Sequence, residues 1–424
     1  MNIAPAHPRD PWKWNIVLAL AFLGLASVRI GVPTTPYFDE IHYIPAARSF
    51  LELQRAVNLE HPPLAKLIIS GGIAMFGDDP LGWRVMSLLF GTLALLAGMR
   101  AMWFASMTRA ASLLTGIFAA TNFLLIVHSR IAMLDVFMVA FVMLALWMCA
   151  GAVRQNETAR WRLALAGASM GAAMACKWGA IPLAVLPGLA FLIARIWSGR
   201  AKFLTTSRGW PIGGMSLLEA GLWLGVVPLA VYAAAFAPYM LFEELPRHPG
   251  SLIALHREMM EMQTQIPVPH PYQSVWWQWV INQRVIWYLY EPIDGAQRGI
   301  MLIGNPLTML AGLPALVWCL WAGVRQGRRD CAALALFFVA SLAMWVIVPK
   351  AVQFYFHYFL PGMFLSAALA LATERLWQRG ERLVPVVLVG GAVGLFAYWF
   401  PILTAAPLVG DQEFLRWAWI ASWR

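Results

Sequence analysis

The chain has 424 residues, of which 60% are hydrophobic and 12% charged, and its formal net charge is +10. Soluble domains carry about 25% charged residues, so this composition excludes a soluble globular protein, and four cysteines are too few for a disulfide scaffold. Long uncharged runs rich in Trp, Phe and Leu also exclude a disordered or fibrous chain. The sequence therefore predicts an all-α integral membrane protein, organised as a single domain over residues 1–424.

Apolar runs long enough to cross a bilayer recur along the whole chain. A bilayer core of about 30 Å requires roughly 20 mostly apolar residues per helix. The eleven runs that meet this length lie near 14–30, 83–103, 110–128, 131–153, 161–176, 178–197, 217–239, 301–323, 331–348, 355–373 and 384–402. Lys177 and Trp178 separate the fifth run from the sixth, and they mark either a tight turn between two helices or an interruption within one.

The charges on the connecting loops predict the orientation, because short loops rich in Lys and Arg stay on the cytoplasmic side. With the N-terminus inside, the short inner connections hold 17 of the 31 basic residues and 6 of the 21 acidic ones. The positive charge thus reports topology, and we expect no nucleic-acid partner. Both long connections, 31–82 and 240–300, and the tail 403–424 then lie outside, so the working surface is expected to face the periplasm or cell exterior.

The first long connection contains an acidic pair, Asp39 and Glu40, at the start of an apolar stripe with helical spacing. This pattern predicts an amphipathic helix that lies flat on the outer membrane surface. The residues of the stripe are Ile41, Ile44, Phe50 and Leu51. The pair either complements the positive end of the helix dipole or belongs to a reactive site.

A second short helix is predicted after Pro62 and Pro63, because proline is tolerated in a first helical turn. Glu60 and His61 lie just before it. Two interfacial helices with carboxylates and an imidazole indicate a reactive centre at the membrane boundary. A transporter is the alternative, but it would place ionisable groups in mid-membrane within broken helices and would show an internal repeat, which we do not find.

Four cations at the outer ends of the predicted helices are not needed for cytoplasmic retention. They are Arg84, Arg130, Lys177 and Lys350. Each either anchors a helix end at the membrane surface or contributes to a site for a lipid-linked phosphate. Asp135, one turn into the fourth span, needs a partner there, and Arg130 or another outer cation is expected to supply it.

The second long connection combines an amphipathic stretch, 251–265, with a cluster of aromatic residues. The tryptophans at 276, 277 and 279 either anchor the chain at the interface or form the wall of a sugar or acceptor groove. We favour His270 and Tyr272 as groove residues over the tryptophans.

An ordered series of motifs between residues 37 and 365 resembles the protein O-mannosyltransferases, which are membrane-embedded GT-C glycosyltransferases. The motifs are the Asp39-Glu40 pair, His-Pro-Pro-Leu-Ala-Lys at 61–66, Arg-Ile-Ala-Met-Leu-Asp at 130–135, Lys-Trp-Gly at 177–179, His-Pro-Tyr-Gln-Ser at 270–274, Gly-Asn-Pro at 304–306 and Phe-Tyr-Phe-His-Tyr-Phe-Leu-Pro at 354–361. The resemblance implies a GT-C fold of about eleven transmembrane helices with interfacial helices in the first outer loop.

The resemblance also implies a reaction. The donor is a sugar, mannose in this family, on a polyprenyl phosphate, and the acceptor is a Ser or Thr hydroxyl of an exported protein. Asp39 would be the general base of an inverting transfer, Glu40 would position a substrate, and Arg84 would contact the donor phosphate. We place His61, Arg130, Asp135, Lys177 and Lys350 on the donor side, and His270, Tyr272 and His357 in the acceptor groove.

Some features leave alternatives open. The chain has no room for the soluble lumenal module of eukaryotic members, so a lipid A or cell-envelope glycan acceptor is an alternative to a protein. We assign no certain cofactor. A divalent metal held by outer histidines with Asp39 or Glu40 stays open, although no His-x-x-x-His spacing supports it. Membrane lipids are expected partners, and the bacterial inner membrane is the expected location.

Overall fold

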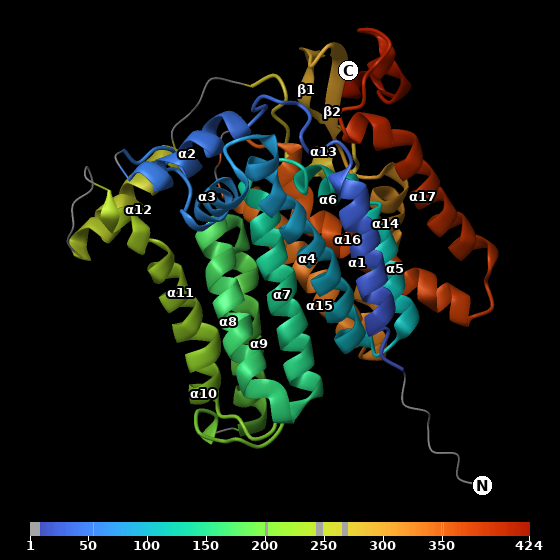
Figure 1. Cartoon of the computed structure of the whole chain (residues 1–424). Coiled ribbons are helices and arrows are strands. Elements are labelled where there is room, and N and C mark those ends of the chain that lie inside the picture. The colour runs from blue at the N-terminus through green and yellow to red at the C-terminus, as the bar shows by residue number, and fades with distance from the viewer. Residues whose placement is uncertain are drawn as a thin grey trace.

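The computed structural model describes residues 9–53, 55–199, 202–242, 249–264, 270–348, 350 and 352–424. Most of these residues form helices, many of which run side by side, and one hairpin of two strands lies at one end of the helices (Figure 1). The α-helices are α1 (Trp12–Ser27), α2 (Glu40–Glu52), α3 (Leu64–Phe76), α4 (Pro80–Ser106), α5 (Arg109–Ala120), α6 (Phe123–His128), α7 (Leu134–Arg154), α8 (Ala159–Cys176), α9 (Ile181–Gly199), α10 (Leu217–Gly221), α11 (Val227–Ala235), α12 (Pro249–Thr264), α13 (Trp276–Val280), α14 (Pro306–Gln326), α15 (Arg329–Ile347), α16 (Phe359–Gln378) and α17 (Leu383–Leu403).

Eight helical segments in the described part of the chain are long and apolar enough to cross a membrane. They are Pro80–Ser106, Leu134–Arg154, Trp178–Gly199, Leu217–Leu241, Pro306–Gln326, Arg329–Ile347, Tyr355–Gln378 and Leu383–Leu403. The chain is therefore a multi-pass integral membrane protein, as predicted. Helices also occupy the three remaining predicted ranges, as α1, the α5–α6 pair and α8, but these do not reach the same length and hydropathy, so eleven spans stays a prediction.

The break at Lys177 separates two helices. Its backbone is extended, with φ −160° and ψ 135°, so α8 ends at Cys176. A single 3-10 turn, Trp178–Ala180, then begins α9, and the two helices lie side by side (Figure 1). The tight turn is thus the correct reading of this segment, and it leaves Lys177 at the junction.

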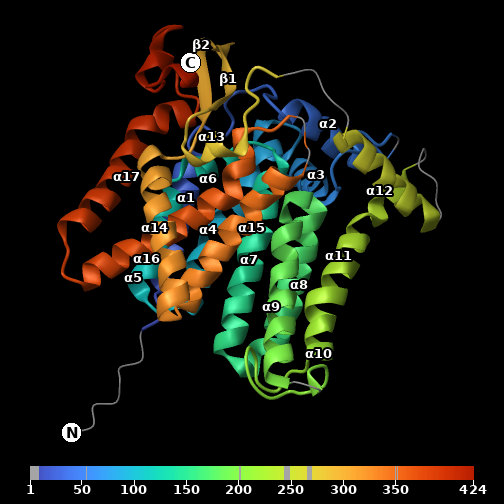
Figure 2. The same ribbon diagram turned by 180° about the vertical axis from the view of Figure 1, so that it is seen from behind.

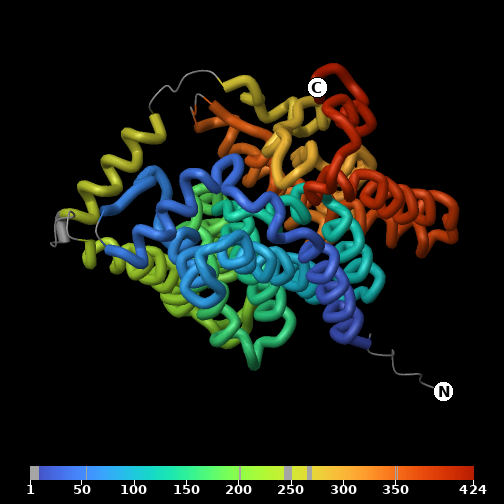
Figure 3. Tube along the Cα trace, turned by 45° about the horizontal axis from the view of Figure 1, so that its top comes forward, coloured from blue at the N-terminus to red at the C-terminus, as the bar shows by residue number. Residues whose placement is uncertain are grey.

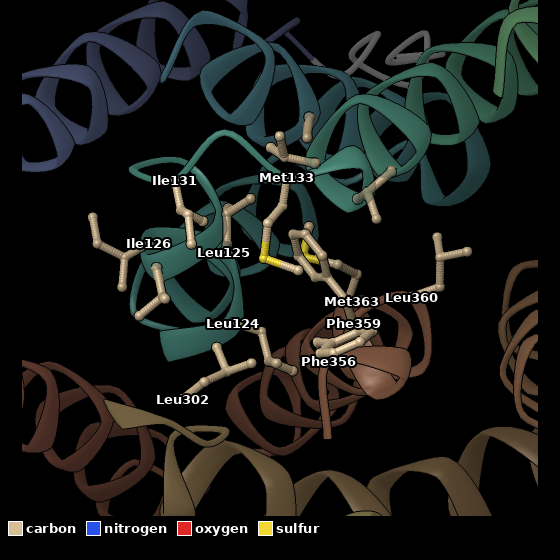
Figure 4. Close-up of a cluster of buried hydrophobic side chains, with 14 of the residues drawn as sticks. Leu124, Leu125, Ile126, Ile131, Met133, Leu302, Phe356, Phe359, Leu360 and Met363 are labelled. Carbon is tan, nitrogen blue, oxygen red and sulfur yellow. The ribbon is translucent and has the colours of Figure 1, made fainter. Parts of the chain in front are cut away.

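The core lies where α6, the segment after it and α16 meet, and α16 is almost entirely buried. Figure 4 shows Leu124 and Met133 from one side of this contact close to Phe359 and Met363 from the other. The helices approach closely because a small residue stands at the crossing: a Cβ added at Gly362 would lie 2.8 Å from Leu124 Cδ1. Such close packing leaves α6 and α16 little room to move relative to each other.

The hairpin was not expected from the sequence, which predicted only helices. Strands β1 (Ile286–Ile293) and β2 (Ala296–Leu302) pair antiparallel, and Asp294 and Gly295 form the turn with φ of 50° and 74°. An Asp-Gly pair between apolar, aromatic-rich stretches is a known hairpin signal, because both turn positions need positive φ. The eighth predicted helix accordingly begins at Pro306 instead of near 301.

The two long connections lie at the same end of the helices, together with the hairpin and the C-terminal residues (Figures 1 and 2). Figure 3 shows the first connection, in blue, next to α12, in yellow-green, and Gln263 Nε2 donates a hydrogen bond of 2.9 Å to Glu60 O. We call this the loop-rich end. Four short connections meet elsewhere, where Ser106, Arg154, Gly327 and Gln378 line one hollow.

Candidate active site

The acidic pair starts α2, as predicted, and its two side chains have opposite surroundings. Asp39 stands at the N-cap position, where its backbone carbonyl accepts hydrogen bonds from the N–H groups of His42 and Tyr43 at 3.0 and 3.1 Å. The Asp39 side chain is partly exposed, whereas that of Glu40 is completely buried.

Glu40 forms a two-pronged ion pair with Arg84 of α4. Arg84 Nε donates to Oε1 and Nη2 donates to Oε2, both at 2.8 Å, and neither side chain is exposed. Oε1 also accepts the backbone N–H of Ala132 at 2.9 Å. Glu40 therefore joins α2 to α4 and to the segment before α7.

Arg84 is fully occupied by protein groups. Besides Glu40, its guanidinium donates to the carbonyl oxygens of Ile30 and Pro33, at 3.1 and 2.8 Å, and of Thr35, at 3.3 Å. Guanidinium has five N–H donors, and all five have acceptors here. Arg84 thus holds the loop that leads to Asp39, and the donor-phosphate contact that the resemblance implies stays a prediction.

Arg130 is occupied in a similar way. Its guanidinium donates to the carbonyl oxygens of Ala26 and Val28, and to that of Arg29 at 3.0 Å. These carbonyls lie at the C-terminal end of α1, where a cation complements the helix dipole. Arg130 thus anchors α1 and does not pair with Asp135.

The partner of Asp135 is Lys177. Lys177 Nζ lies 2.9 Å from Oδ1 and 2.8 Å from Oδ2, and both side chains are buried. The ammonium also stands 4.8 Å from the centroid of the Phe356 ring. The extended residue between α8 and α9 thereby directs a positive charge toward the first turn of α7.

Asp39 faces this pair without bonding to it. Its carboxylate has no hydrogen bond or ion pair among the described residues, and burial raises its pKa to about 6. The charges of Lys177, His42 and Lys350 oppose that rise, while Asp135 adds to it. A half-buried carboxylate with a raised pKa and no partner is available for proton transfer.

Lys350 contributes a second cation. Its ammonium makes no ion pair within the described part of the chain and is partly exposed. Burial and the charge of Lys177 lower its pKa to about 8, against the opposing charges of Asp135 and Asp39. We call Asp39, Asp135, Lys177 and Lys350 the charge cluster. The structure brings these four predicted residues together, although they come from four separate segments.

His61 lies beside the cluster, and its pKa is well below the usual value because of burial and the charges of Lys177 and Lys350. Its turn is held by Lys66, whose Nζ donates to the carbonyls of Asn58 and His61, at 2.5 and 2.8 Å, and to Tyr239 Oη at 3.2 Å. Sequence reasoning did not single out Lys66 as a site residue. Its place one turn into the helix after two prolines was the available signal.

The three predicted groove residues are divided between a buried and an exposed position. His357 is buried against Trp345, with ring centroids 3.8 Å apart, and its Nε2 has no hydrogen-bond partner within the described residues. His270 is exposed and meets Phe354 edge-on at 5.1 Å, and Tyr272 is partly exposed next to it. His270 and Tyr272 therefore lie at a rim, and no contact joins them to the charge cluster among the described residues.

No three His, Cys, Asp or Glu side chains are grouped so as to hold a metal ion in the described ranges. The charge cluster thus combines a carboxylate and an ammonium that lack ion pairs among the described residues, Asp39 and Lys350, with the buried Lys177–Asp135 pair.

Comparisons with known proteins agree on one family. The model described as dolichyl-phosphate-mannose-protein mannosyltransferase matches residues 60–218, and that of the C-terminal four TMM region of protein-O-mannosyltransferase matches residues 250–423. A polyprenol-phosphate-mannose–protein mannosyltransferase of Corynebacterium glutamicum is 26% identical, with 100% of this chain and 96% of the relative covered. The enzyme of the same name from Mycobacterium tuberculosis is also 26% identical, with coverage of 100% and 94%.

Solved structures share the fold. The S. cerevisiae protein O-mannosyltransferase Pmt1-Pmt2 complex bound to the sugar donor matches with a TM-score of 0.79 and 13% identity, covering 97% of this chain and 93% of that one. ArnT from Cupriavidus metallidurans bound to undecaprenyl phosphate matches with a TM-score of 0.63 and 16% identity, covering 97% and 69%. At these identities the likeness concerns the fold alone.

Proposed function

Since this chain belongs to the protein O-mannosyltransferase family of GT-C membrane glycosyltransferases, we propose that it transfers mannose from a polyprenyl phosphate to a Ser or Thr hydroxyl of an exported protein. The relatives named for this reaction align with the whole chain. One observation carries the assignment of the site: the only partner-free carboxylate of the acidic pair, Asp39, faces the cations Lys177 and Lys350.

Asp39 is the general base in this proposal. The acceptor oxygen attacks C1 of the sugar, the C1–O bond to the phosphate breaks, and the hydroxyl proton passes to the Asp39 carboxylate. With a pKa of about 6, this carboxylate is a stronger base than an ordinary aspartate and is still ionised at neutral pH. A single displacement with no covalent intermediate inverts the configuration at C1.

Lys350 and Lys177 stabilise the leaving group. Departure converts the phosphodiester of the donor into a polyprenyl phosphate monoester, which gains negative charge. Within the charge cluster, Lys350 is the cation that has no ion pair among the described residues, so its ammonium is free to bind the phosphate directly. Lys177 shares its charge with Asp135, which fixes its position, and it acts on the same region through the field.

The buried residues around the cluster position it. Glu40 and Arg84 hold the loop and helix from which Asp39 projects, and Arg130 holds the end of α1 below it. His61 stands close to Lys177 and Lys350 on the donor side. His357, His270 and Tyr272 border the acceptor groove, since they continue from the buried to the exposed side of the Phe354 ring.

The loop-rich end is proposed to face the periplasm or cell exterior of a bacterial inner membrane, with the N-terminus in the cytoplasm. Support comes from the loops: Arg154, Arg328 and Arg329 lie together around the hollow away from that end, as expected for connections retained inside. An exported acceptor then reaches Asp39 from the water side, while the polyprenyl chain of the donor stays in the lipid.

The test uses the purified protein in nanodiscs with polyprenyl phosphate carrying radiolabelled mannose and a Ser/Thr-rich peptide. Label is expected on the peptide, with release of polyprenyl phosphate, and Asp39→Asn is expected to abolish both. Glu52→Gln, at an exposed position on the same helix, is the control and should keep full activity. Full activity of Asp39→Asn would remove the base assignment. Label on lipid A or an envelope glycan, but not on any peptide, would assign the other acceptor class.

A further inference from the structure

Phe38, directly before Asp39, has an unusual backbone conformation. Its φ is +49°, in the left-handed region that a bulky side chain rarely adopts. The turn matters because no side-chain bond fixes the Asp39 carboxylate, which has no hydrogen-bond or ion-pair partner among the described residues, unlike that of Glu40. The direction of Asp39 is therefore set by the backbone at residues 38 and 39.

The Phe38 ring is held by the hairpin. It stacks on Tyr288 of β1, with ring centroids 4.0 Å apart and planes within 20°, and it meets Phe356 edge-on at 6.2 Å. Tyr288 is buried, and it is separated from Phe38 by 250 residues along the chain. An aromatic stack of this geometry supplies attraction beyond simple burial of area.

Tyr288 is held in turn by His128 at the end of α6. The Tyr288 hydroxyl lies 3.2 Å from His128 Nε2, and His128 Nδ1 lies 2.7 Å from Leu124 O. A carbonyl oxygen only accepts, so Nδ1 carries the hydrogen and Nε2 accepts from Tyr288. The His128 ring also stacks on Phe359 of the buried helix α16, with centroids 4.6 Å apart. Figure 4 shows Phe359 within the tightly packed core.

We propose that Phe38, Tyr288 and His128 form an aromatic column that fixes the turn before Asp39 and thereby aims its carboxylate at the acceptor hydroxyl. This inference rests on the proposed function, in which Asp39 is the base. We assign the three as positioning residues, because their contacts connect the turn to the buried helix α16. The hydrogen bond between Tyr288 and His128 fixes the relative position of these two side chains, because burying either group unpaired in an apolar core is unfavourable.

The decisive variant is Phe38→Gly, which tolerates the positive φ but removes the ring. The readouts are kcat with saturating donor and peptide, KM for the donor, and the thermal midpoint in nanodiscs. We expect kcat to fall about 30-fold, since small displacements of a reacting group cost up to about 100-fold, while donor KM and the thermal midpoint change little. Phe38→Tyr keeps the stack and should restore kcat to within about 3-fold of the wild type.

Tyr288→Phe separates the two halves of the column, because it keeps the stack and removes the hydrogen bond to His128. We expect kcat to fall about 5-fold, from the net contribution of one hydrogen bond. Phe76→Ala, at an exposed aromatic of α3, is the matched control and should leave kcat unchanged.

Two results would overturn the proposal. One is a Phe38→Gly variant with the kcat of the wild type. The other is a variant in which donor KM and the thermal midpoint change as strongly as kcat, because this would indicate a general loss of structure. These results are distinct from failure of the proposed function itself. If the wild-type protein transferred sugar to no hydroxyl acceptor, the function would be wrong whatever the variants did. An active wild type with an equally active Phe38→Gly would remove only the column.

Discussion

The loop-rich end contains two neighbouring sets of charged side chains that differ in burial and in their hydrogen-bond partners. Glu40 and Arg84 are completely buried, and every donor of the guanidinium has a protein acceptor. Asp39, the adjacent residue, and Lys350 have no ion-pair or side-chain hydrogen-bond partner among the described residues. The first set holds segments of the chain together, and the second is the set that we propose to meet the substrates. The two sets lie close together, so the presence or absence of hydrogen-bond partners distinguishes them better than their position does.

Asp39→Asn tests the comparison most strongly. We expect kcat to fall about 1,000-fold, within the range of general-base catalysis. Folding stability should rise at pH 7.5, because a carboxylate whose folded pKa lies above its unfolded value destabilises the folded state once it is ionised. This gain should disappear below about pH 4, where Asp39 is protonated in both states. Turnover measurements and thermal melts at the two pH values check both parts. A stability loss at pH 7.5 would contradict the picture of an unpaired charge.

Arg84→Ala tests the first set, the fully bonded Glu40 and Arg84. Removing one member of a buried pair leaves Glu40 charged and unpaired, so we expect a loss of about 3–5 kcal/mol in stability. Glu40→Gln with Arg84→Met removes both charges and should recover part of that loss. Denaturation in detergent micelles measures the difference. If Arg84→Ala were as stable as the wild type and affected only the KM for the donor, Arg84 would instead act at the donor phosphate, as the resemblance implies.

Lys350→Ala tests the second set, Asp39 and Lys350, on the donor side. A hydrogen bond to a charged group contributes about 1.5–3 kcal/mol, so the KM for the donor should rise roughly 10- to 100-fold. Stability should change little, because the Lys350 side chain is partly exposed and its ammonium forms no ion pair in the described part of the chain. Arg154→Ala, at the hollow away from the loop-rich end, serves as the control for loss of a cation. An unchanged donor KM in Lys350→Ala would assign the phosphate to another group.

The pH dependence of kcat/KM gives the finest test. The acid limb should lie near pH 6, where Asp39 loses its ability to accept a proton, and the alkaline limb near pH 8, where Lys350 loses its charge. Lys350→Arg keeps the charge at high pH, so the alkaline limb should move above about pH 9. An alkaline limb that stays at pH 8 in this variant would exclude Lys350 as its source.

The sequence predicted the elements of the fold better than their contacts. Apolar periodicity located helices in every predicted range, and the acidic pair was correctly placed at the start of α2. The hairpin was missed because its strands are as apolar as the helices beside them. The Asp294-Gly295 turn was the distinguishing signal, and it needs only local geometry.

The sequence could not predict which groups the cations bond to. Arg84 and Arg130 bond mainly to backbone carbonyls, and the direction of a carbonyl depends on how distant segments pack. For Asp135 the sequence left its partner open, and Lys177 is 42 residues away. Motif resemblance selected Asp39 and Lys177, and the position at the outer end of a span selected Lys350, but neither signal distinguishes a cation with a protein partner from one without.

The connection between the hairpin turn and the first loop has a consequence for biogenesis. Thr34 donates two hydrogen bonds to the Asp294 carboxylate, through its backbone N–H at 3.0 Å and its hydroxyl at 2.5 Å. A ribosome delivers Asp39 within the first tenth of the chain, but Tyr288 and Lys350 only in its last third. A partly inserted chain therefore contains Asp39 but lacks Tyr288 and Lys350. In the proposed mechanism, transfer therefore requires nearly the whole chain to be inserted.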